Sequence, residues 1–282
     1  MKGIMIQGTA SSVGKSLIAV AFCRLLYESG YQVAPFKAQN VTQNFHINSQ
    51  GEKIAKSQAI QAKAAKTKAS TFMNPTSLTL GEQKSKVILL GKEAGIFKRT
   101  KNHKYVYEKW IKTIQTSLDQ LHKQYDSLVI EGAGSPVELN LKDQDVANMK
   151  TAELADVPVI LVADINKGGA FASIVGTLEL LTPEERKRVK GIIINKFQGK
   201  KSLFQNGIRL MEQKTNLPVL GVLPYIDHDI EEEDNMDLLD KNCNATTSSL
   251  PTDDQIESLA QKMKQHLNWE QIIEIIEQWD MR

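Results

Sequence analysis

Apolar segments recur along the chain and alternate with segments that have the spacing of amphipathic helices. Most of the apolar segments are continuous, which is typical of strands that are covered on both faces of a sheet. They comprise residues 3–7, 31–36, 127–131, 157–164, 191–195 and 219–224. Helices are predicted directly after the first strand and over residues 53–66, 105–124, 170–181 and 203–214. This alternation predicts an α/β fold with a doubly wound, mostly parallel sheet.

The C-terminal part of the chain departs from this alternation. An acidic run at 231–234 and a polar stretch follow the last predicted strand, which indicates a surface loop or linker. Thr252 is predicted to begin a last helix, whose apolar face would carry Ile256, Leu259, Met263 and Leu267. We therefore predict a main domain over residues 1–240, followed by a linker and a C-terminal helix over 241–282.

Composition and charge exclude several classes of protein. The chain has 35 Lys and Arg against 33 Asp and Glu, so its net charge of +2 does not indicate a nucleic-acid partner. The apolar runs fall well short of the ~20 residues that a membrane-spanning helix needs, so no membrane partner is expected. Cys23 and Cys243 share no metal-binding or redox spacing, and the first residues lack the pattern of a signal peptide. We expect a cytoplasmic protein.

The strongest chemical signal lies between the first predicted strand and the first predicted helix. A glycine-containing loop here can wrap its N–H groups around phosphate oxygens, Lys15 can neutralise the β and γ phosphates, and Ser16 can place its hydroxyl on Mg²⁺. Five residues separate Gly8 from Gly14, one more than in the common pattern. The alternative is a turn that happens to precede a lysine. The predicted ATP-binding residues of the loop are Gly8, Thr9, Ser11, Ser12, Val13, Gly14, Lys15 and Ser16.

Position 10 separates two groups of proteins that have such variant loops. Partitioning ATPases carry an extra lysine five positions before the invariant one, and this chain has Ala10 there. The absence of that lysine favours the group of dethiobiotin synthetase and the amide-forming corrinoid synthases.

Further motifs follow the predicted strands in a fixed order. They are Pro35-Phe36-Lys37-Ala38-Gln39-Asn40, Glu131-Gly132-Ala133-Gly134-Ser135-Pro136, Asn148-Met149, the run from Asp164 to Gly168-Gly169, and Asn195-Lys196-Phe197. Together they resemble the synthetase domain of cobyric acid synthases over about residues 1–237. This resemblance implies a P-loop NTPase fold of the dethiobiotin synthetase-like type. It also implies an amide-forming ligase of cobalamin biosynthesis that uses ATP and Mg²⁺ to convert corrin carboxylates into acyl phosphates, which ammonia then attacks.

The residues at the strand ends suit the transfer of a phosphoryl group. Such a transfer gathers negative charge, so cations must be held around it, and the predicted catalytic residues are Lys15 and Lys37. The resemblance places Lys37 between the phosphate and the substrate carboxylate; the alternative is a solvated lysine. Glu131 ends an apolar strand, so with Ser16 it is predicted to hold Mg²⁺. The resemblance places Asn195 at the adenine edge, although it could equally be a strand-end cap.

Two polar groups are candidates for binding the corrinoid substrate. Amide side chains can bind both a carboxylate and the amide that replaces it, without adding charge. Those that follow the second strand are Gln39, Asn40, Asn44, Gln58 and Gln61. Asp164, Gly168 and Gly169 come at another strand end and form a candidate substrate rim. Either group could also consist of ordinary surface residues.

The chain departs from the family in ways that leave other functions open. Thr79 stands in a region where the family has a lysine. The family normally continues into a glutamine amidotransferase domain, which we do not find, so ammonia is expected from solution or from a separate glutaminase chain. Related ATPases dimerise, so a homodimer is expected. The alternatives are an ATP-dependent synthetase for another acid and a non-catalytic, regulatory ATP-binding dimer.

Overall fold

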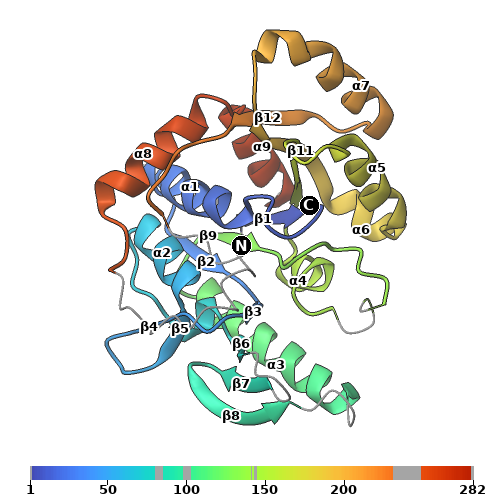
Figure 1. The fold of residues 1–282 in the computed structure, drawn as a ribbon. Helices are drawn as coiled ribbons and strands as arrows, with labels where there is room; N and C mark the ends of the chain where they lie inside the picture. Colours follow the sequence, from blue (N-terminus) through green and yellow to red (C-terminus); the bar gives the residue numbers. More distant parts are fainter. Residues whose placement is uncertain are drawn as a thin grey trace.

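A parallel six-stranded sheet forms the centre of the protein, of which the computed structural model describes residues 2–79, 85–97, 103–140, 142, 145–230 and 249–280. The strand order is β12-β11-β10-β1-β9-β2 (Figure 1). Their bounds are β1 (Lys2–Gly8), β2 (Val33–Phe36), β9 (Ser127–Glu131), β10 (Val159–Asp164), β11 (Val189–Phe197) and β12 (Val219–Pro224). All neighbouring strands in this sheet pair in parallel. The predicted doubly wound α/β fold is therefore confirmed.

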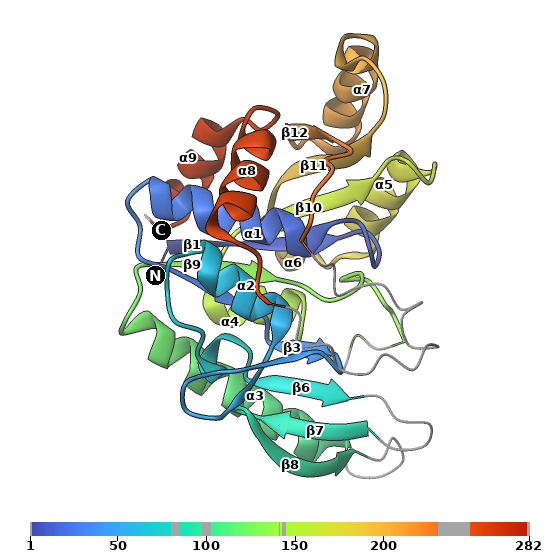
Figure 2. The same ribbon diagram turned by 60° about the vertical axis from the view of Figure 1, so that its left-hand side comes forward.

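Helices cover both faces of this sheet. The side chains of β1 alternate between the faces, so Ile4 and Ile6 belong to one apolar cluster and Met5 to the other. The cluster around Ile4 and Ile6 contains residues of α1 (Lys15–Glu28), α8 (Asp253–Lys264) and α9 (Trp269–Asp280). The cluster around Met5 contains residues of α3 (His103–His122), α4 (Met149–Ala155), α5 (Ala170–Leu180) and α7 (Gln205–Thr215). Figure 2 shows α1, α8 and α9 together on their face.

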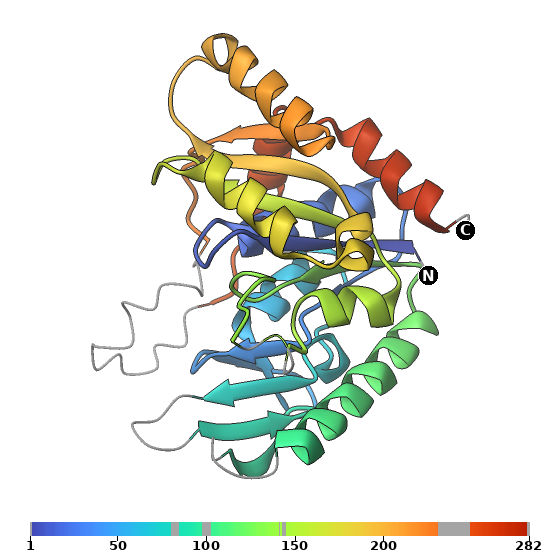
Figure 3. The same cartoon turned by 90° about the vertical axis from the view of Figure 1, so that its right-hand side faces the viewer.

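A smaller sheet, which the hydrophobic pattern did not predict, lies beside α3 (Figure 3). Its strand order is β3-β6-β7-β8, with β3 (Gln39–Val41), β6 (Thr76–Thr79), β7 (Ser85–Leu89) and β8 (Lys92–Phe97). A hairpin-like pair of β4 (Phe45–Ile47) and β5 (Lys53–Ala55) precedes α2 (Lys56–Ala64). The helix predicted over 53–66 is thus shorter, because its first three residues form β5. The short elements η1 (Thr71–Met73), α6 (Pro183–Arg188) and η3 (Lys201–Phe204) complete the described structure.

The prediction of a single C-terminal helix was wrong, because the segment forms two helices. Thr252 caps α8 as expected, and its side chain accepts a hydrogen bond from the backbone N–H of Gln255. Between α8 and α9, the backbone N–H of Asn268 donates to Leu220 O at 2.7 Å, which ties the break to β12. Both helices share the core of the sheet. The predicted boundary at residue 240 lies outside the described residues, so the division into 1–240 and 241–282 stays a prediction.

In the described part of the chain, no helix combines the length and the apolar character that crossing a membrane requires.

Candidate active site

The predicted phosphate loop connects β1 to α1 at the carboxyl end of the central sheet. Gly14 has a left-handed φ of 97°, and a Cβ there would lie 2.2 Å from Asn195 Nδ2. Asn195 Nδ2 donates to Val13 O at 2.8 Å, and Lys196 Nζ donates to Ser12 O at 2.7 Å. The end of β11 therefore holds two consecutive carbonyl groups of the loop and leaves no room for a side chain at position 14. The other predicted loop residues, Gly8, Thr9 and Ser11, precede these two carbonyls along the chain.

Lys15 is buried at the start of α1, with 1% of its surface exposed. Its ammonium group donates to Ala10 O at 3.0 Å and to Gly134 O at 3.3 Å. Gly134 belongs to the segment after β9, so the lysine spans the space between two loops at the same edge of the sheet. A buried ammonium group beside the first N–H groups of a helix favours the binding of an anion.

Lys37, Glu131 and Ser16 come from three separate elements and meet in one cluster. Glu131 is fully buried at the end of β9. Its Oε1 accepts hydrogen bonds from Ser16 Oγ at 2.6 Å and from Lys37 Nζ at 2.9 Å. The Lys37 side chain is only 4% exposed, so both members of this ion pair are secluded from water. A pair of this kind costs desolvation energy that its own attraction only partly offsets, which is a frequent property of functional sites.

Gln61 is a further hydrogen-bond donor to Glu131. It lies on α2 without exposed surface, and its Nε2 donates to Glu131 Oε2 at 2.6 Å. From the sequence, Gln61 is grouped with the amide side chains that are candidates for binding substrate. The structure instead places it on the carboxylate of the predicted metal site.

These side chains fit a magnesium ion. Mg²⁺ prefers hard oxygen ligands, and it is usually bound through one or two carboxylates together with substrate phosphates and water. Ser16 Oγ and Glu131 Oε1 are 2.6 Å apart, and Gln61 Oε1 is buried with no hydrogen-bond partner among the residues that the structure describes. In the part of the chain that the structure describes, no group of three His, Cys, Asp or Glu side chains is placed to hold a metal ion.

Two residues that support the site were not assigned a role from the sequence. Asn148 Oδ1 accepts from the Ala133 N–H at 2.9 Å, which braces the segment after β9. Asp145 Oδ1 accepts hydrogen bonds from the backbone N–H groups of Ala147 and Asn148, which holds the backbone at Asn148 in place. Burial raises the pKa of Asp145, and these backbone hydrogen bonds oppose the rise. The Asn148-Met149 motif was visible in the sequence, but the contact with Ala133 depends on the fold.

The candidate substrate amides divide into a buried and an exposed part. Asn40 Nδ2 donates to Gln58 Oε1 at 3.1 Å, and both side chains are buried. Within the described chain, Gln39 Nε2 and Gln58 Nε2 are buried donors without a hydrogen-bond partner. Asn44 is exposed on the loop after β3. The structure thus brings Asn40 and Gln58 into contact and leaves Asn44 at the surface.

The candidate rim at the end of β10 has a different character. Asp164 is buried and lies 3.4 Å from Lys196 Nζ, so it is linked to the residue that holds the phosphate loop. Gly168 and Gly169 are exposed, with left-handed φ values of 73° and 67°, directly before α5. Asn195 contacts the loop carbonyl described above. Its role at the adenine edge stays a prediction.

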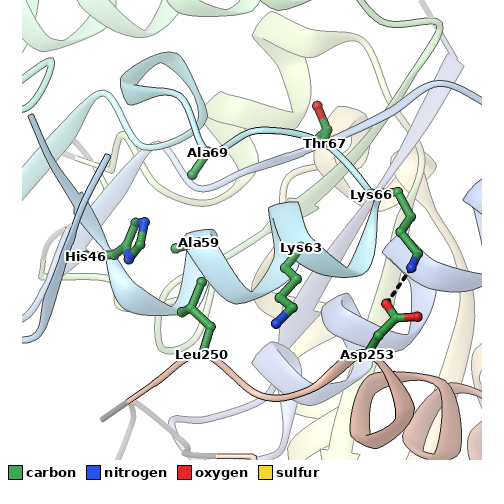
Figure 4. A pocket seen from close by; sticks show the side chains of 8 residues that line it. All are labelled: His46, Ala59, Lys63, Lys66, Thr67, Ala69, Leu250 and Asp253. Atoms are coloured by element: carbon green, nitrogen blue, oxygen red, sulfur yellow. Dashed lines mark ion pairs between the residues drawn. The ribbon is translucent and has the colours of Figure 1, made fainter. Parts of the chain in front are cut away.

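A pocket of about 380 Å³ lies elsewhere, between α2, β4 and the start of α8 (Figure 4). Lys66 and Asp253 form an ion pair of 2.7 Å at its border. Its lining residues are His46, Ala59, Lys63, Lys66, Thr67, Ala69, Leu250 and Asp253. None of the predicted site residues is among them, so the candidate active site is defined by its side-chain contacts and not by this cavity.

The fold and the loop between β1 and α1 define a P-loop nucleotide-binding protein of the α/β class. The chain belongs to the CobQ/CobB/MinD/ParA nucleotide binding domain family, whose model matches residues 4–239. This match confirms the predicted class of nucleotide-binding domain, whereas the roles of individual side chains stay predictions.

Among curated proteins, the chain is similar to cobyric acid synthases, which confirms the resemblance that the motifs indicated. It is 46% identical to that of Streptococcus sanguinis strain SK36 over 243 residues, which cover 86% of this chain and 48% of the relative. It is 49% identical to that of Clostridium perfringens strain 13 over 238 residues, which cover 83% of this chain and 48% of the relative. The chain therefore spans about half the length of these curated relatives.

Solved structures with a similar course of the chain are much more distant in sequence. The signal recognition particle receptor FtsY from Elizabethkingia anophelis in complex with GDP is 13% identical, with a TM-score of 0.48 and coverage of 79% of this chain and 57% of that chain. The MinC:MinD cell division protein complex of Aquifex aeolicus is 12% identical, with a TM-score of 0.44 and coverage of 79% and 81%.

Proposed function

We propose that this protein uses ATP to activate peripheral carboxylates of a corrin substrate for amide formation, as an ATP-dependent carbon–nitrogen ligase of the cobyric acid synthase type. The identity of 46% to 49% to cobyric acid synthases supports the substrate class. The single observation that carries the chemistry is the cluster of Lys37, Glu131 and Ser16 beside the phosphate loop. Lys37 is a second cation, in addition to Lys15, next to the predicted nucleotide site. Such a cation is expected where the γ-phosphoryl group is transferred, and nucleotide binding alone would not need it.

The proposed reaction has two steps. A carboxylate oxygen of the substrate attacks the γ-phosphorus, and the bond to the ADP oxygen breaks, which gives an acyl phosphate and ADP. Ammonia then attacks the acyl carbon and loses a proton, and inorganic phosphate leaves with the bonding electron pair. The product is an amide.

The residues of the chain have separate tasks in the first step. The loop N–H groups and Lys15 bind and orient the phosphate chain, with Asn195 and Lys196 bracing the loop. Lys37 neutralises the charge that gathers on the transferring group. Ser16 and Glu131 would hold Mg²⁺, which when bound supplies further neutralisation of the phosphate oxygens.

The amide side chains suit a substrate that changes from acid to amide. Gln39 and Gln58 each have a buried N–H₂ donor that is without a partner in the described structure, and Asn40 contacts Gln58. Because these donors are neutral, they can bind both the substrate carboxylate and the product amide, without a strong preference for the carboxylate. Asn44, Asp164, Gly168 and Gly169 would contact outer parts of the same substrate.

The partners follow from the same proposal. Ammonia would come from solution or from a separate glutaminase chain, and the active species would be a cytoplasmic homodimer. Light scattering tests the dimer directly, because a mass near 31.5 kDa would show a monomer.

The decisive experiment is an amidation assay read by mass spectrometry. Purified protein is incubated with cobyrinic acid a,c-diamide, ATP and Mg²⁺, together with either ¹⁵N-ammonium or amide-¹⁵N-glutamine. Successive incorporation of ¹⁵N from ammonium, and none from glutamine, is the expected result. Absence of any labelled corrinoid, with ATP binding demonstrated by calorimetry, would refute the corrinoid substrate. It would direct the search to another carboxylic acid, as in dethiobiotin synthetase.

A further inference from the structure

Gln61 is the one amide of α2 whose donor is engaged with the predicted metal site. The side chain is fully buried, and its Nε2 donates to Glu131 Oε2 at 2.6 Å. Its Oε1 is also buried and accepts no hydrogen bond from the described residues. A buried amide oxygen without a partner destabilises the fold, because it has lost its water without compensation.

The hydrogen bond to Glu131 determines where this oxygen lies. A reversed amide would bring two acceptor oxygens together, so the donor must face the carboxylate. Amide bonds of about 1.2 and 1.3 Å keep Oε1 within about 5 Å of Glu131 Oε2. Two oxygens on one Mg²⁺ ion, each at about 2.1 Å, are separated by up to about 4.2 Å. The upper limit of about 5 Å exceeds this separation by less than 1 Å, so the unpaired oxygen can reach an ion on Glu131 Oε2 after a small shift of the side chains or through one bound water.

We propose that Gln61 contributes an oxygen to the magnesium site, as a third protein ligand beside Ser16 and Glu131, either directly or through one bound water. The inference rests on the proposed ATP-dependent function, since it concerns the ion that accompanies the nucleotide. A neutral amide oxygen adds a hard ligand without the repulsion that a second carboxylate beside Glu131 would bring before the ion binds. The ligand role also explains why Gln61 donates from Nε2 to the Glu131 carboxylate and keeps its Oε1 available as an acceptor beside it.

A purely structural role for Gln61 would differ in its consequences. In that case the side chain serves only to donate to Glu131, and its oxygen has no function. Gln61→Glu separates the two roles, because it keeps an oxygen at this position and removes the donor. If Gln61 has only a structural role, Gln61→Glu should lower the stability of the site both with and without a divalent ion. If Gln61 is a ligand, addition of a divalent ion should restore that stability.

The test measures Mn²⁺ affinity in the complex with ADP, by electron paramagnetic resonance of free Mn²⁺, and needs no turnover. Gln61→Leu should weaken Mn²⁺ binding by about 10-fold or more. Gln61→Glu should bind Mn²⁺ at least as tightly as wild type, and its Tm should be lower than that of wild type without the ion and rise more when Mn²⁺ is added. Gln213→Leu, at an exposed position of α7, is the matched control and should change neither quantity.

Three results would overturn the inference: unchanged Mn²⁺ affinity in Gln61→Leu, weaker binding in Gln61→Glu than in wild type, or no Mn²⁺ binding by the wild-type ADP complex. If Gln61→Leu does not fold, Gln61→Glu decides alone. Failure of the proposed function has a different signature. Wild-type protein would then bind Mn²⁺ and ADP with the expected dependence on Gln61 but would give no labelled corrinoid.

Discussion

A glycine with a left-handed backbone lies near each end of α1, but only one of the two is closely surrounded by other atoms. Gly14 at the amino end has a φ of 97°, and Gly30 just beyond the carboxyl end has a φ of 93°. A Cβ on Gly14 would lie 2.2 Å from Asn195 Nδ2, whereas a Cβ on Gly30 would meet nothing within 4 Å. Both positions need left-handed backbone, but only the amino end is enclosed by another strand of the sheet.

The ion pairs near the two ends differ in the same way. At the amino end, Lys37 and Glu131 have side-chain exposures of 4% and 0%. Towards the carboxyl end, Arg24 has 3%, but its partner Asp253 on α8 is 46% exposed. Water screens the second pair, whereas the first pair is almost fully buried. The amino end therefore holds a buried ion pair beside the predicted phosphate loop, while the pair towards the other end joins α1 to α8.

Removal of Lys37 should give the largest effect. Lys37→Met leaves Glu131 buried without its cation, so the free energy of unfolding should fall by about 3–5 kcal/mol in urea denaturation. ATP binding should persist, and acyl-phosphate formation should fall about 100- to 1,000-fold. The double variant Lys37→Met/Glu131→Gln should recover most of the stability but none of the activity. If Lys37→Met were as stable as wild type, the seclusion of this pair from water would be refuted.

Removal of Lys15 should act on nucleotide binding. Lys15→Ala loses a charged donor to the phosphates, worth about 3 kcal/mol, so calorimetry should show ATP affinity reduced about 100-fold. Lys214→Ala, at an exposed position in the last turn of α7, is the control and should bind ATP like wild type. Unchanged ATP affinity in Lys15→Ala would contradict the assignment of the phosphate loop.

The paired glycines test the enclosure of the amino end. Gly14→Ala and Gly30→Ala should each lose about 1–2 kcal/mol of stability, because both place an alanine in the left-handed region. Gly14→Ala must also displace Asn195, so its ATP affinity should fall by about tenfold or more, equivalent to about 1.4 kcal/mol. Equal ATP affinity in the two variants would show that the contact with Asn195 does not shape the loop.

The screened ion pair should give the smallest effect, and one that depends on pH. The hydrogen bond from Lys66, and then that from Arg24, lowers the pKa of Asp253. A lowered folded-state pKa adds stability above the unfolded value of about 3.9, and this stability is lost as pH falls through the folded value. Asp253→Asn should therefore cost at most about 1 kcal/mol at pH 7, and the difference from wild type should shrink towards pH 3. A constant difference across that range would contradict the ion pair.

Contiguous motifs were predictable because their neighbours in sequence are also their neighbours in space. The phosphate loop and its predicted ligand Ser16 follow from a strand, a loop and a helix in direct succession, and Glu131 follows from its place at the end of β9. The contact between Gln61 and Glu131 joins residues that are 70 positions apart, and that between Asn195 and Val13 spans 182. No local pattern encodes such a pairing, so these contacts were not predicted.

The missed elements have physical reasons of their own. Strands β3 and β6 have only 3 and 4 residues, and several side chains of the smaller sheet are exposed or polar, so its strands lack the continuous apolar pattern of the central strands. The break between α8 and α9 has no Gly or Pro to mark it. It forms because Asn268 bonds to Leu220 O and Leu267 bridges to Gly221, which are contacts with β12.

The amino-acid sequence was sufficient to predict the parallel α/β architecture, the phosphate loop and the charged residues that end the central strands. These depend on hydrophobic periodicity and on residues close together along the chain. The folded chain was needed to show that Lys37, Ser16 and Gln61 share the carboxylate of Glu131, and that the end of β11 braces the loop. The reason is that a buried charge must find partners wherever the packed fold brings polar groups, whatever their distance in sequence.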